Sequence, residues 1–152
     1  LRVSTAFVET VDQHRADLLT RFEPYFGDEG FRRLMHHGAH FANAHFDASN
    51  SATAPGHATV ATGATPRVHG IVANKWYMDD GTTQARYAVA DDTCSPVPAD
   101  DRPGGGRSPN RLCAATLGDQ MKLSDRRARV VSIATKDRAA IFLGGRLADT
   151  AL

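Results

Sequence analysis

Segments with the composition of β-strands alternate with segments that have the spacing of α-helices, and this alternation constrains the fold most strongly. Val3 to Val11 reads as an apolar strand that delivers Asp12 to its C-terminal end. Arg15 to Phe22 follows with the apolar spacing of a short helix, which should end before Pro24. Arg129 to Thr135 is rich in β-branched residues and is typical of a buried strand. The alternation predicts an α/β domain with a mainly parallel central sheet flanked by helices.

Further helices and one irregular segment are expected between those strands. An apolar spacing that begins at Phe31 predicts a helix that Gly38 ends. A second helix is expected from Thr53 to about Thr62. A third is expected from Ser108, a capping hydroxyl followed by proline, to about Leu123. Residues 78–107 are polar and rich in proline and glycine, which predicts an irregular surface excursion.

The composition and net charge limit the classes of protein to which this chain can belong. The chain has 152 residues, of which 41% are hydrophobic and 23% charged, so residues 1–152 can form one globular domain or part of one. A net charge of +1 provides no field to attract nucleic acid or an anionic membrane surface. No apolar run approaches the roughly 20 residues of a membrane span. The chain opens on Leu1 and has no signal peptide, so we expect a mature or trimmed product or a piece of a longer protein.

The two cysteines leave two interpretations open. Cys113 falls with Leu117 and Met121 on one helical stripe, which favours a core position. A disulfide between Cys94 and Cys113 would instead suit an exported protein.

The histidines are interpreted as structural. Three of them resemble a metal cluster, but Gly38 ends the helix between them, so we expect surface or boundary positions for His36, His37 and His40. Packing and turn geometry are the roles we assign to His57 and His69.

Thr53 is the candidate nucleophile. As the N-cap of a helix that contains Pro55 in its first turn, its hydroxyl would lie at the positive end of the helix dipole, which favours an incoming phosphate and an ionised oxygen. A bound divalent metal could hold the alkoxide directly. The plainer alternative is an N-cap threonine with no catalytic role.

Asp12 is the candidate metal ligand. Sites in open α/β sheets gather at the carboxyl ends of strands, where Asp12 is expected to lie, and a hard carboxylate suits zinc or, more weakly, magnesium. The alternative is an aspartate that caps the following helix. Glu9 departs from an apolar strand and would need an edge position or a cationic partner.

A pair of cations, Lys136 and Arg138, follows the strand that ends near Thr135. The planar guanidinium can bind two oxygens of a phosphate, and the lysine adds a mobile point charge. A phosphate monoester carries one more negative charge than a diester, so two cations favour monoester substrates. The alternative is a solvated charge run after a strand.

Four motifs together resemble the bacterial alkaline phosphatases of the phosphate-irrepressible type, in the superfamily of nucleotide pyrophosphatase/phosphodiesterases. The resemblance extends from about Val3 to Leu152 and covers only the front part of such an enzyme. The motifs are Val11-Asp12-Gln13, Thr53-Ala54-Pro55-Gly56-His57, Gly70-Ile71-Val72-Ala73-Asn74-Lys75-Trp76-Tyr77 and Lys136-Asp137-Arg138-Ala139-Ala140-Ile141.

The resemblance implies roles for these residues. Thr53 would attack phosphorus and form a phosphothreonine intermediate, and the Asn74 amide would donate to a non-bridging phosphate oxygen. Lys136 and Arg138 would mark the phosphomonoesterase branch. Asp12 and Thr53 would be ligands in a centre of two zinc ions, and the enzyme would be periplasmic or secreted. Asn74 could alternatively be a turn asparagine.

Two other functions remain open at this level. One is a phosphodiesterase of the same superfamily, and the other is a catalytically incomplete, non-enzymatic fragment. The resembled enzymes take their other metal ligands from chain beyond the Lys-Asp-Arg segment. We therefore expect residues 1–152 alone to be inactive, with the remainder of the enzyme in another chain portion.

Overall fold

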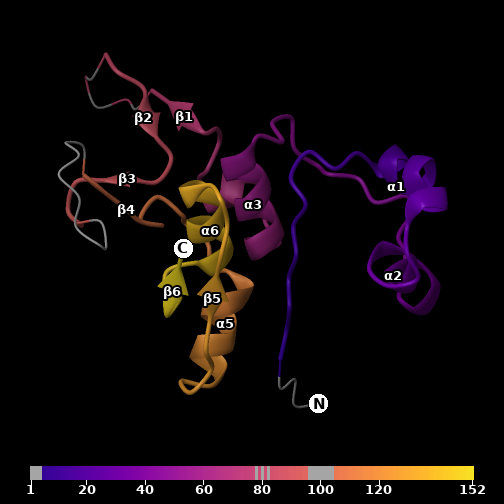
Figure 1. Ribbon diagram of the computed structural model, residues 1–152. Helices are drawn as coiled ribbons and strands as arrows, with labels where there is room; N and C mark the ends of the chain where they lie inside the picture. Colours follow the sequence, from indigo (N-terminus) through magenta and orange to yellow (C-terminus); the bar gives the residue numbers. More distant parts are fainter. Residues whose placement is uncertain (1–4, 78, 80, 82, 96–104) are drawn as a thin grey trace. The chain divides into compact units, whose positions relative to one another are not determined.

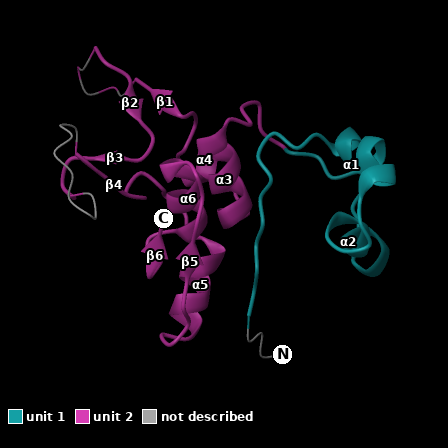
Figure 2. Cartoon of the chain, in the orientation of Figure 1, with its two compact units in different colours: residues 1–46 teal, residues 47–152 magenta. Residues whose placement is uncertain are grey.

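A computed structural model describes residues 5–77, 79, 81, 83–95 and 105–152 of the chain. These residues form two compact units, Leu1–Phe46 and Asp47–Leu152, which are coloured separately in Figure 2. Figure 1 traces the helices and strands along the sequence.

The first unit is helical between Ala16 and His37. It contains α1, a 3-10 turn η1 and α2, with bounds Ala16–Phe22, Glu23–Tyr25 and Phe31–His37. Gly38 ends α2, and its N–H donates to the carbonyl of Leu34 at 2.9 Å. The predicted helices at Arg15–Phe22 and from Phe31 to Gly38 are thus confirmed.

The predicted first strand, Val3 to Val11, is wrong over its described part. Residues 5–11 have no regular secondary structure. An extended segment becomes a strand only when a neighbouring strand accepts and donates its backbone hydrogen bonds, and the described residues of this unit provide no such neighbour. The apolar side chains of Phe7 and Val8 are exposed as a result.

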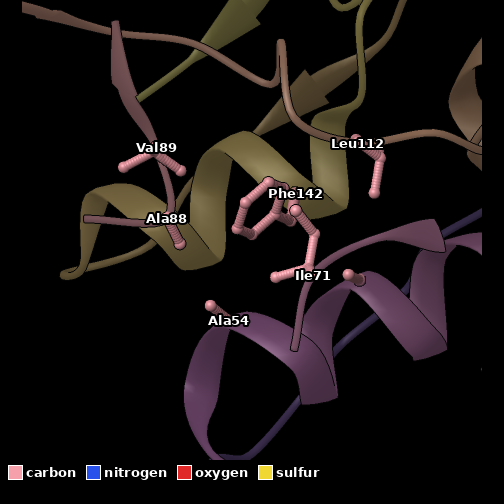
Figure 3. Packing of buried hydrophobic residues seen from close by; sticks show 7 residues of the cluster. Ala54, Ile71, Ala88, Val89, Leu112 and Phe142 are labelled. Atoms are coloured by element: carbon pink, nitrogen blue, oxygen red, sulfur yellow. The ribbon is translucent and has the colours of Figure 1, made fainter. Parts of the chain in front are cut away.

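The described residues of the second unit form four helices, of which α3 and α6 pack against each other most extensively. Phe142 of α6 is fully buried and lies in a cluster with Ala54, Ile71 and Leu112 (Figure 3). The helices α3, α4, α5 and α6 have the bounds Thr53–Thr62, Pro66–His69, Leu117–Ser124 and Asp137–Gly144.

The strands of the second unit form three two-stranded pairs. The β1/β2 and β3/β4 pairs are antiparallel, and β5/β6 is parallel. The α/β class is therefore confirmed, and the mainly parallel sheet is represented here by the β5/β6 pair. The predicted irregular surface excursion at 78–107 is wrong over part of its described residues, because β2, β3 and β4 form there and Ala88 and Val89 are buried in the core cluster. Residues 78, 80, 82 and 96–104 lie outside the described residues. Strand bounds are Lys75–Trp76, Arg86–Tyr87, Ala90–Asp91, Gly106–Arg107, Val131–Ser132 and Thr150–Ala151.

The predicted strand at Arg129–Thr135 forms, but it is shorter than predicted and only its Ser132 is buried. Regular pairing covers Val131–Ser132, and the side chains of Val131 and Ile133 are 60% and 73% exposed. Leu152, which follows β6, is also exposed. The β-branched composition predicted a strand buried in a wide sheet, whereas the described residues pair it with one neighbour only. This leaves an apolar surface uncovered.

The predicted helix from Ser108 to Leu123 begins later than predicted. Its first residue is Leu117, and Thr116 caps it by accepting from the N–H of Asp119 at 3.1 Å while Asp119 accepts from the N–H of Thr116. Ser108 instead donates to Asp91 and accepts from the N–H of Asn110, so its hydroxyl supports a turn.

The later helix start also changes the environment of the cysteines. Cys113 precedes the helix and is exposed, so its predicted core position is wrong. Both Cys94 and Cys113 are free thiols.

Candidate active site

Thr53 lies at the start of α3, as the first helical residue instead of the N-cap predicted from the sequence. The N-cap is Ala52, whose N–H donates to the side-chain oxygen of Asn50 at 3.0 Å. The N–H of Ala54 donates to the side-chain oxygen of Asn74 at 2.8 Å, and Pro55 has no N–H. Two amides of the helix start are thus already bound by asparagines. An anion at this helix start would therefore be stabilised mainly by the helix dipole and less by free N–H donors.

The position of Thr53 is fixed by packing. Its side chain is largely buried, with 8% of the residue exposed, and Ala54 beside it is fully buried in the core cluster. Within the helix, Nδ1 of the buried His57 lies 2.7 Å from the carbonyl oxygen of Thr53. The neighbouring hydroxyl, Ser51, lies before the helix and is exposed.

Asn74 is held at both its side chain and its backbone. Its side-chain oxygen accepts from Ala54 and its carbonyl oxygen accepts from the N–H of Ala88 at 2.9 Å. Because the side-chain oxygen is the acceptor in the first contact, the amide NH₂ is the end of the side chain that can donate to a substrate. These bonds connect the start of α3 to the segment that follows β2.

Arg138 lies in the first turn of α6 and binds Tyr87 of β2. Its Nη1 donates to the Tyr87 hydroxyl at 2.7 Å, and that hydroxyl donates to Oδ1 of Asp137 at 2.5 Å. Arg107 of β4 donates from Nε to Oδ2 of the same carboxylate at 3.1 Å. The guanidinium of Arg138 is therefore held through a neutral phenol, with the nearest Asp137 oxygen 4.0 Å from Nη1.

Tyr87 is surrounded by cations. The guanidinium carbons of Arg107 and Arg138 lie 5.4 and 5.7 Å from its ring centroid, and Nζ of Lys75 lies 6.0 Å from it. Burial raises the pKa of Tyr87 above its ordinary value, the hydrogen bond to Asp137 raises it further, and Arg138 opposes both. The phenol thus keeps its proton in mildly alkaline solution.

Lys136 is the N-cap of α6 and is exposed. Its carbonyl oxygen accepts from the N–H groups of Ala139 and Ala140, which fixes the backbone next to Arg138. Thr53, Asn74, Lys136 and Arg138 therefore all lie in the second unit, at or beside the N-terminal ends of the packed helices α3 and α6.

Asp12 lies in the first unit. It follows an extended segment and forms a turn with Gln13, which has a positive φ of 62°. The N–H of His14 donates to the carbonyl of Val11 across this turn at 3.3 Å. The Asp12 carboxylate and the Thr53 hydroxyl are hard oxygen donors that suit a divalent cation. A zinc site takes about four ligands, and the described residues contain no group of three or more His, Cys, Asp or Glu that could hold a metal.

Three histidines lie at the surface, as the sequence predicted, and His69 is buried. His36, His37 and His40 are exposed. His69 is fully buried, and burial lowers its pKa. Its Nδ1 accepts from the N–H of Ile71 at 3.1 Å, so its Nε2 carries the proton and donates to the Thr59 hydroxyl at 3.0 Å.

Tyr87, Asp137 and Arg107 were not predicted as site residues. Tyr87 and Arg107 lie within the polar range 78–107, and no local pattern distinguishes them. Asp137 was quoted only as part of the Lys-Asp-Arg motif. Their connection depends on contacts between residues 30 to 51 positions apart.

The N-terminal ends of the packed helices α3 and α6 carry the Thr53 hydroxyl and the Arg138 guanidinium, and the Asn74 side chain is bound to the first of these ends. These are chemical groups that can bind a phosphoryl group. In agreement, the sequence model of the family "Type I phosphodiesterase / nucleotide pyrophosphatase" matches residues 8–130, and the chain belongs to this family. The family is one of phosphoester-cleaving hydrolases.

Several curated relatives of the chain are bacterial alkaline phosphatases; another, from Myroides odoratus, is named a calcium-transporting ATPase. Alkaline phosphatase PafA of Elizabethkingia meningoseptica is 37% identical over 136 residues, which cover 89% of this chain and 25% of PafA. Alkaline phosphatase PhoK of a Sphingomonas species is 38% identical over 141 residues, 92% of this chain and 25% of PhoK. The chain therefore spans about a quarter of the length of these relatives.

Solved structures give the same fold. The crystal structure of wild-type PafA matches with a TM-score of 0.87 at 35% identity, over 92% of this chain and 27% of that one. A second structure, with a TM-score of 0.87 at 33% identity, is of a PafA variant in which one threonine, one asparagine, one lysine and one arginine are replaced. The alkaline phosphatase-like fold is thus confirmed.

Among the helices in the described part of the chain, none has the length and apolar character needed to cross a membrane.

Proposed function

We propose that this chain supplies the nucleophile and the phosphate-binding groups of an alkaline phosphatase-like phosphomonoesterase. Thr53 attacks phosphorus and becomes a phosphothreonine, Asn74 donates to a non-bridging oxygen, and Lys136 with Arg138 binds the remaining negative charge. The substrates are small-molecule phosphate monoesters, and the enzyme is periplasmic or secreted.

The hydrogen bond from Ala54 to Asn74 is the observation that carries this proposal. It joins the residue after the nucleophile to the residue proposed as the amide donor. A donor whose orientation is fixed before the substrate arrives stabilises the charge that develops in the transition state without reorganising. The position of Arg138 at the start of the adjacent helix α6 supplies the positive charge.

The PafA variant offers independent support. Its replaced threonine, asparagine, lysine and arginine follow one another at the same intervals along the chain as Thr53, Asn74, Lys136 and Arg138. Residues that are replaced together in one variant are a natural choice for probing one site. This supports treating the four residues of this chain as one functional group.

Asp12 and Thr53 would hold part of a centre of two zinc ions, whose chemistry is to activate the nucleophile and stabilise the leaving oxygen. The other ligands come from the remainder of the enzyme, which lies outside these residues. The exposed apolar side chains of Val131 and Ile133 support further structure packing beside β5.

A phosphodiesterase of the same family is the second candidate, because the matched family is described by that activity. The two candidates differ in what Lys136 and Arg138 do, since a diester lacks the charge that these cations would meet. A catalytically incomplete fragment is the third.

The experiment that tests the proposal replaces Thr53 by Ala in the complete enzyme and follows hydrolysis of a phosphate monoester. We expect turnover to be abolished with the fold intact, while the matched variant Ser51→Ala retains it. Near-normal turnover by Thr53→Ala together with its loss in Ser51→Ala would transfer the nucleophile to Ser51.

A further inference from the structure

Tyr87 separates Arg138 from the nearest carboxylate. Direct pairing of Arg138 with Asp137 would neutralise the guanidinium and compete with a substrate for it. Instead the closest approach of Nη1 to Asp137 is 4.0 Å, and the Tyr87 oxygen lies between them in the hydrogen-bond chain, 2.7 Å from Nη1 and 2.5 Å from Oδ1.

The direction of these bonds is fixed by chemistry. An ionised carboxylate can only accept, so the Tyr87 hydroxyl gives its proton to Asp137 and its oxygen accepts from Arg138. Asp137 is itself held, because its Oδ1 accepts from the backbone N–H of Arg138 at 2.7 Å and its Oδ2 accepts from Arg107 at 3.1 Å. The phenol is therefore oriented by a carboxylate that cannot turn freely.

Arg138 retains donors that these contacts do not use. A guanidinium has five N–H donors, and Tyr87 takes one of them. Among the described residues, Nε of Arg138 is a buried side-chain nitrogen without a hydrogen-bond partner. A buried unpaired donor is unfavourable, and an anion bound at this guanidinium would provide acceptors.

We propose that Tyr87 is a positioning residue for phosphate binding: its hydroxyl, oriented by Asp137, holds the Arg138 guanidinium in place and keeps the carboxylate from forming a direct hydrogen bond with it. The inference rests on the proposed function in that Arg138 binds the transferred phosphoryl group. Tyr87 does not touch the substrate in this proposal.

The test uses Tyr87→Phe in the complete enzyme, because this change removes the hydroxyl and keeps the ring that packs against the core cluster. We expect kcat/KM for a phosphate monoester to fall about tenfold, with little change for a phosphate diester. The loss should disappear in an Arg138→Ala background, where there is no guanidinium to position. Tyr25→Phe is the matched control, since Tyr25 is 83% exposed.

A purely structural role for Tyr87 gives a different pattern. Equal losses on monoester and diester, or a Tyr87→Phe loss that adds fully to that of Arg138→Ala, would overturn the proposal.

Calorimetric binding of inorganic phosphate separates this inference from the proposed function, because binding requires no turnover. Weaker phosphate binding by Tyr87→Phe, seen only when Arg138 is present, supports positioning even if Thr53→Ala shows that another residue is the nucleophile. Unchanged phosphate affinity in Tyr87→Phe refutes positioning even if Thr53 is the nucleophile.

Discussion

The backbone N–H of Ala54 donates to the side-chain oxygen of Asn74 at 2.8 Å, which fixes the amide of the asparagine beside the start of α3. Twenty positions separate the two residues along the chain. The bond consumes one amide of the helix start and turns the NH₂ group of Asn74 into the donor available there. The helix start therefore acts through a side chain that it orients as well as through its dipole.

Asn74→Ala should lower kcat/KM for monoesters by a factor of about 10²–10³, the usual effect of removing one preorganised donor. The matched control is Asn50→Ala, because Asn50 also accepts from an N–H at this helix start, that of Ala52. Both variants should lose about 1 kcal/mol of stability, measured by denaturant unfolding. If Asn50→Ala lost as much activity as Asn74→Ala, the donor role of Asn74 would be refuted.

Replacing Lys136 and Arg138 together by Ala should lower monoester hydrolysis far more than any diester hydrolysis. The reason is the additional negative charge of the monoester, which these cations would meet. Steady-state kinetics on a monoester and a diester with the same leaving group measure the ratio of the two losses in activity. Equal losses on the two substrates would favour the phosphodiesterase candidate.

Asp149 should make stability depend on pH. Its carboxylate binds Lys122 Nζ at 2.6 Å, the N–H of Val130 at 2.8 Å and Arg129 Nη1 at 3.0 Å. The hydrogen bond to Lys122 is the largest cause that holds the Asp149 pKa well below its ordinary value. A depressed folded pKa stabilises the protein above the unfolded value of about 3.9, and this contribution is lost as the pH falls through the folded pKa.

The corresponding variant is Asp149→Asn, which should lower the thermal midpoint at pH 7. The difference in thermal midpoint between the variant and the unmodified protein should shrink below about pH 4, because Asp149 of the unfolded chain begins to take up protons there. Asp47→Asn, at an exposed position, is the control and should leave the midpoint unchanged at both pH values. A difference for Asp149→Asn that is the same at every pH would contradict this account.

Residues 1–152 expressed alone should bind zinc weakly and show no phosphatase turnover. The ligands that this chain offers by motif are Asp12 and Thr53, whereas a tight zinc site takes about four. Zinc titration and a monoester assay at high protein concentration measure both properties. Tight binding of two zinc ions with turnover would contradict this prediction. It would make His36, His37 and His40 candidate zinc ligands.

Local signals predicted some of the helices. The helix from Thr53 to about Thr62 and the helix ended by Gly38 were predicted close to their observed bounds, because capping and apolar spacing act within a few residues. The helices α4 and α6 were not predicted. Local signals gave the wrong helix start where two hydroxyl side chains could each cap the same helix. Ser108-Pro109 has the pattern of a helix start, yet Thr116 makes the capping box with Asp119, and Ser108 bonds to Asp91 instead.

Long-range contacts explain the other features that differ between the prediction from the sequence and the structure. The strand pattern of Val3 to Val11 could not reveal whether a partner strand would pair with it. The position of Tyr87 between Arg138 and Asp137 depends on contacts about 50 residues apart, for which spacing gives no signal. The motif residues themselves could be named from the sequence, but the groups that orient them could not.

Trapping the covalent intermediate tests the central proposal most directly. The complete enzyme is mixed with a phosphate monoester, quenched in acid during turnover, digested and sequenced by mass spectrometry. We predict one added phosphoryl group on Thr53 in the peptide that also contains Ser51, and none in the Thr53→Ala variant. A phosphoryl group on Ser51 or on any residue other than Thr53 would contradict the proposed mechanism.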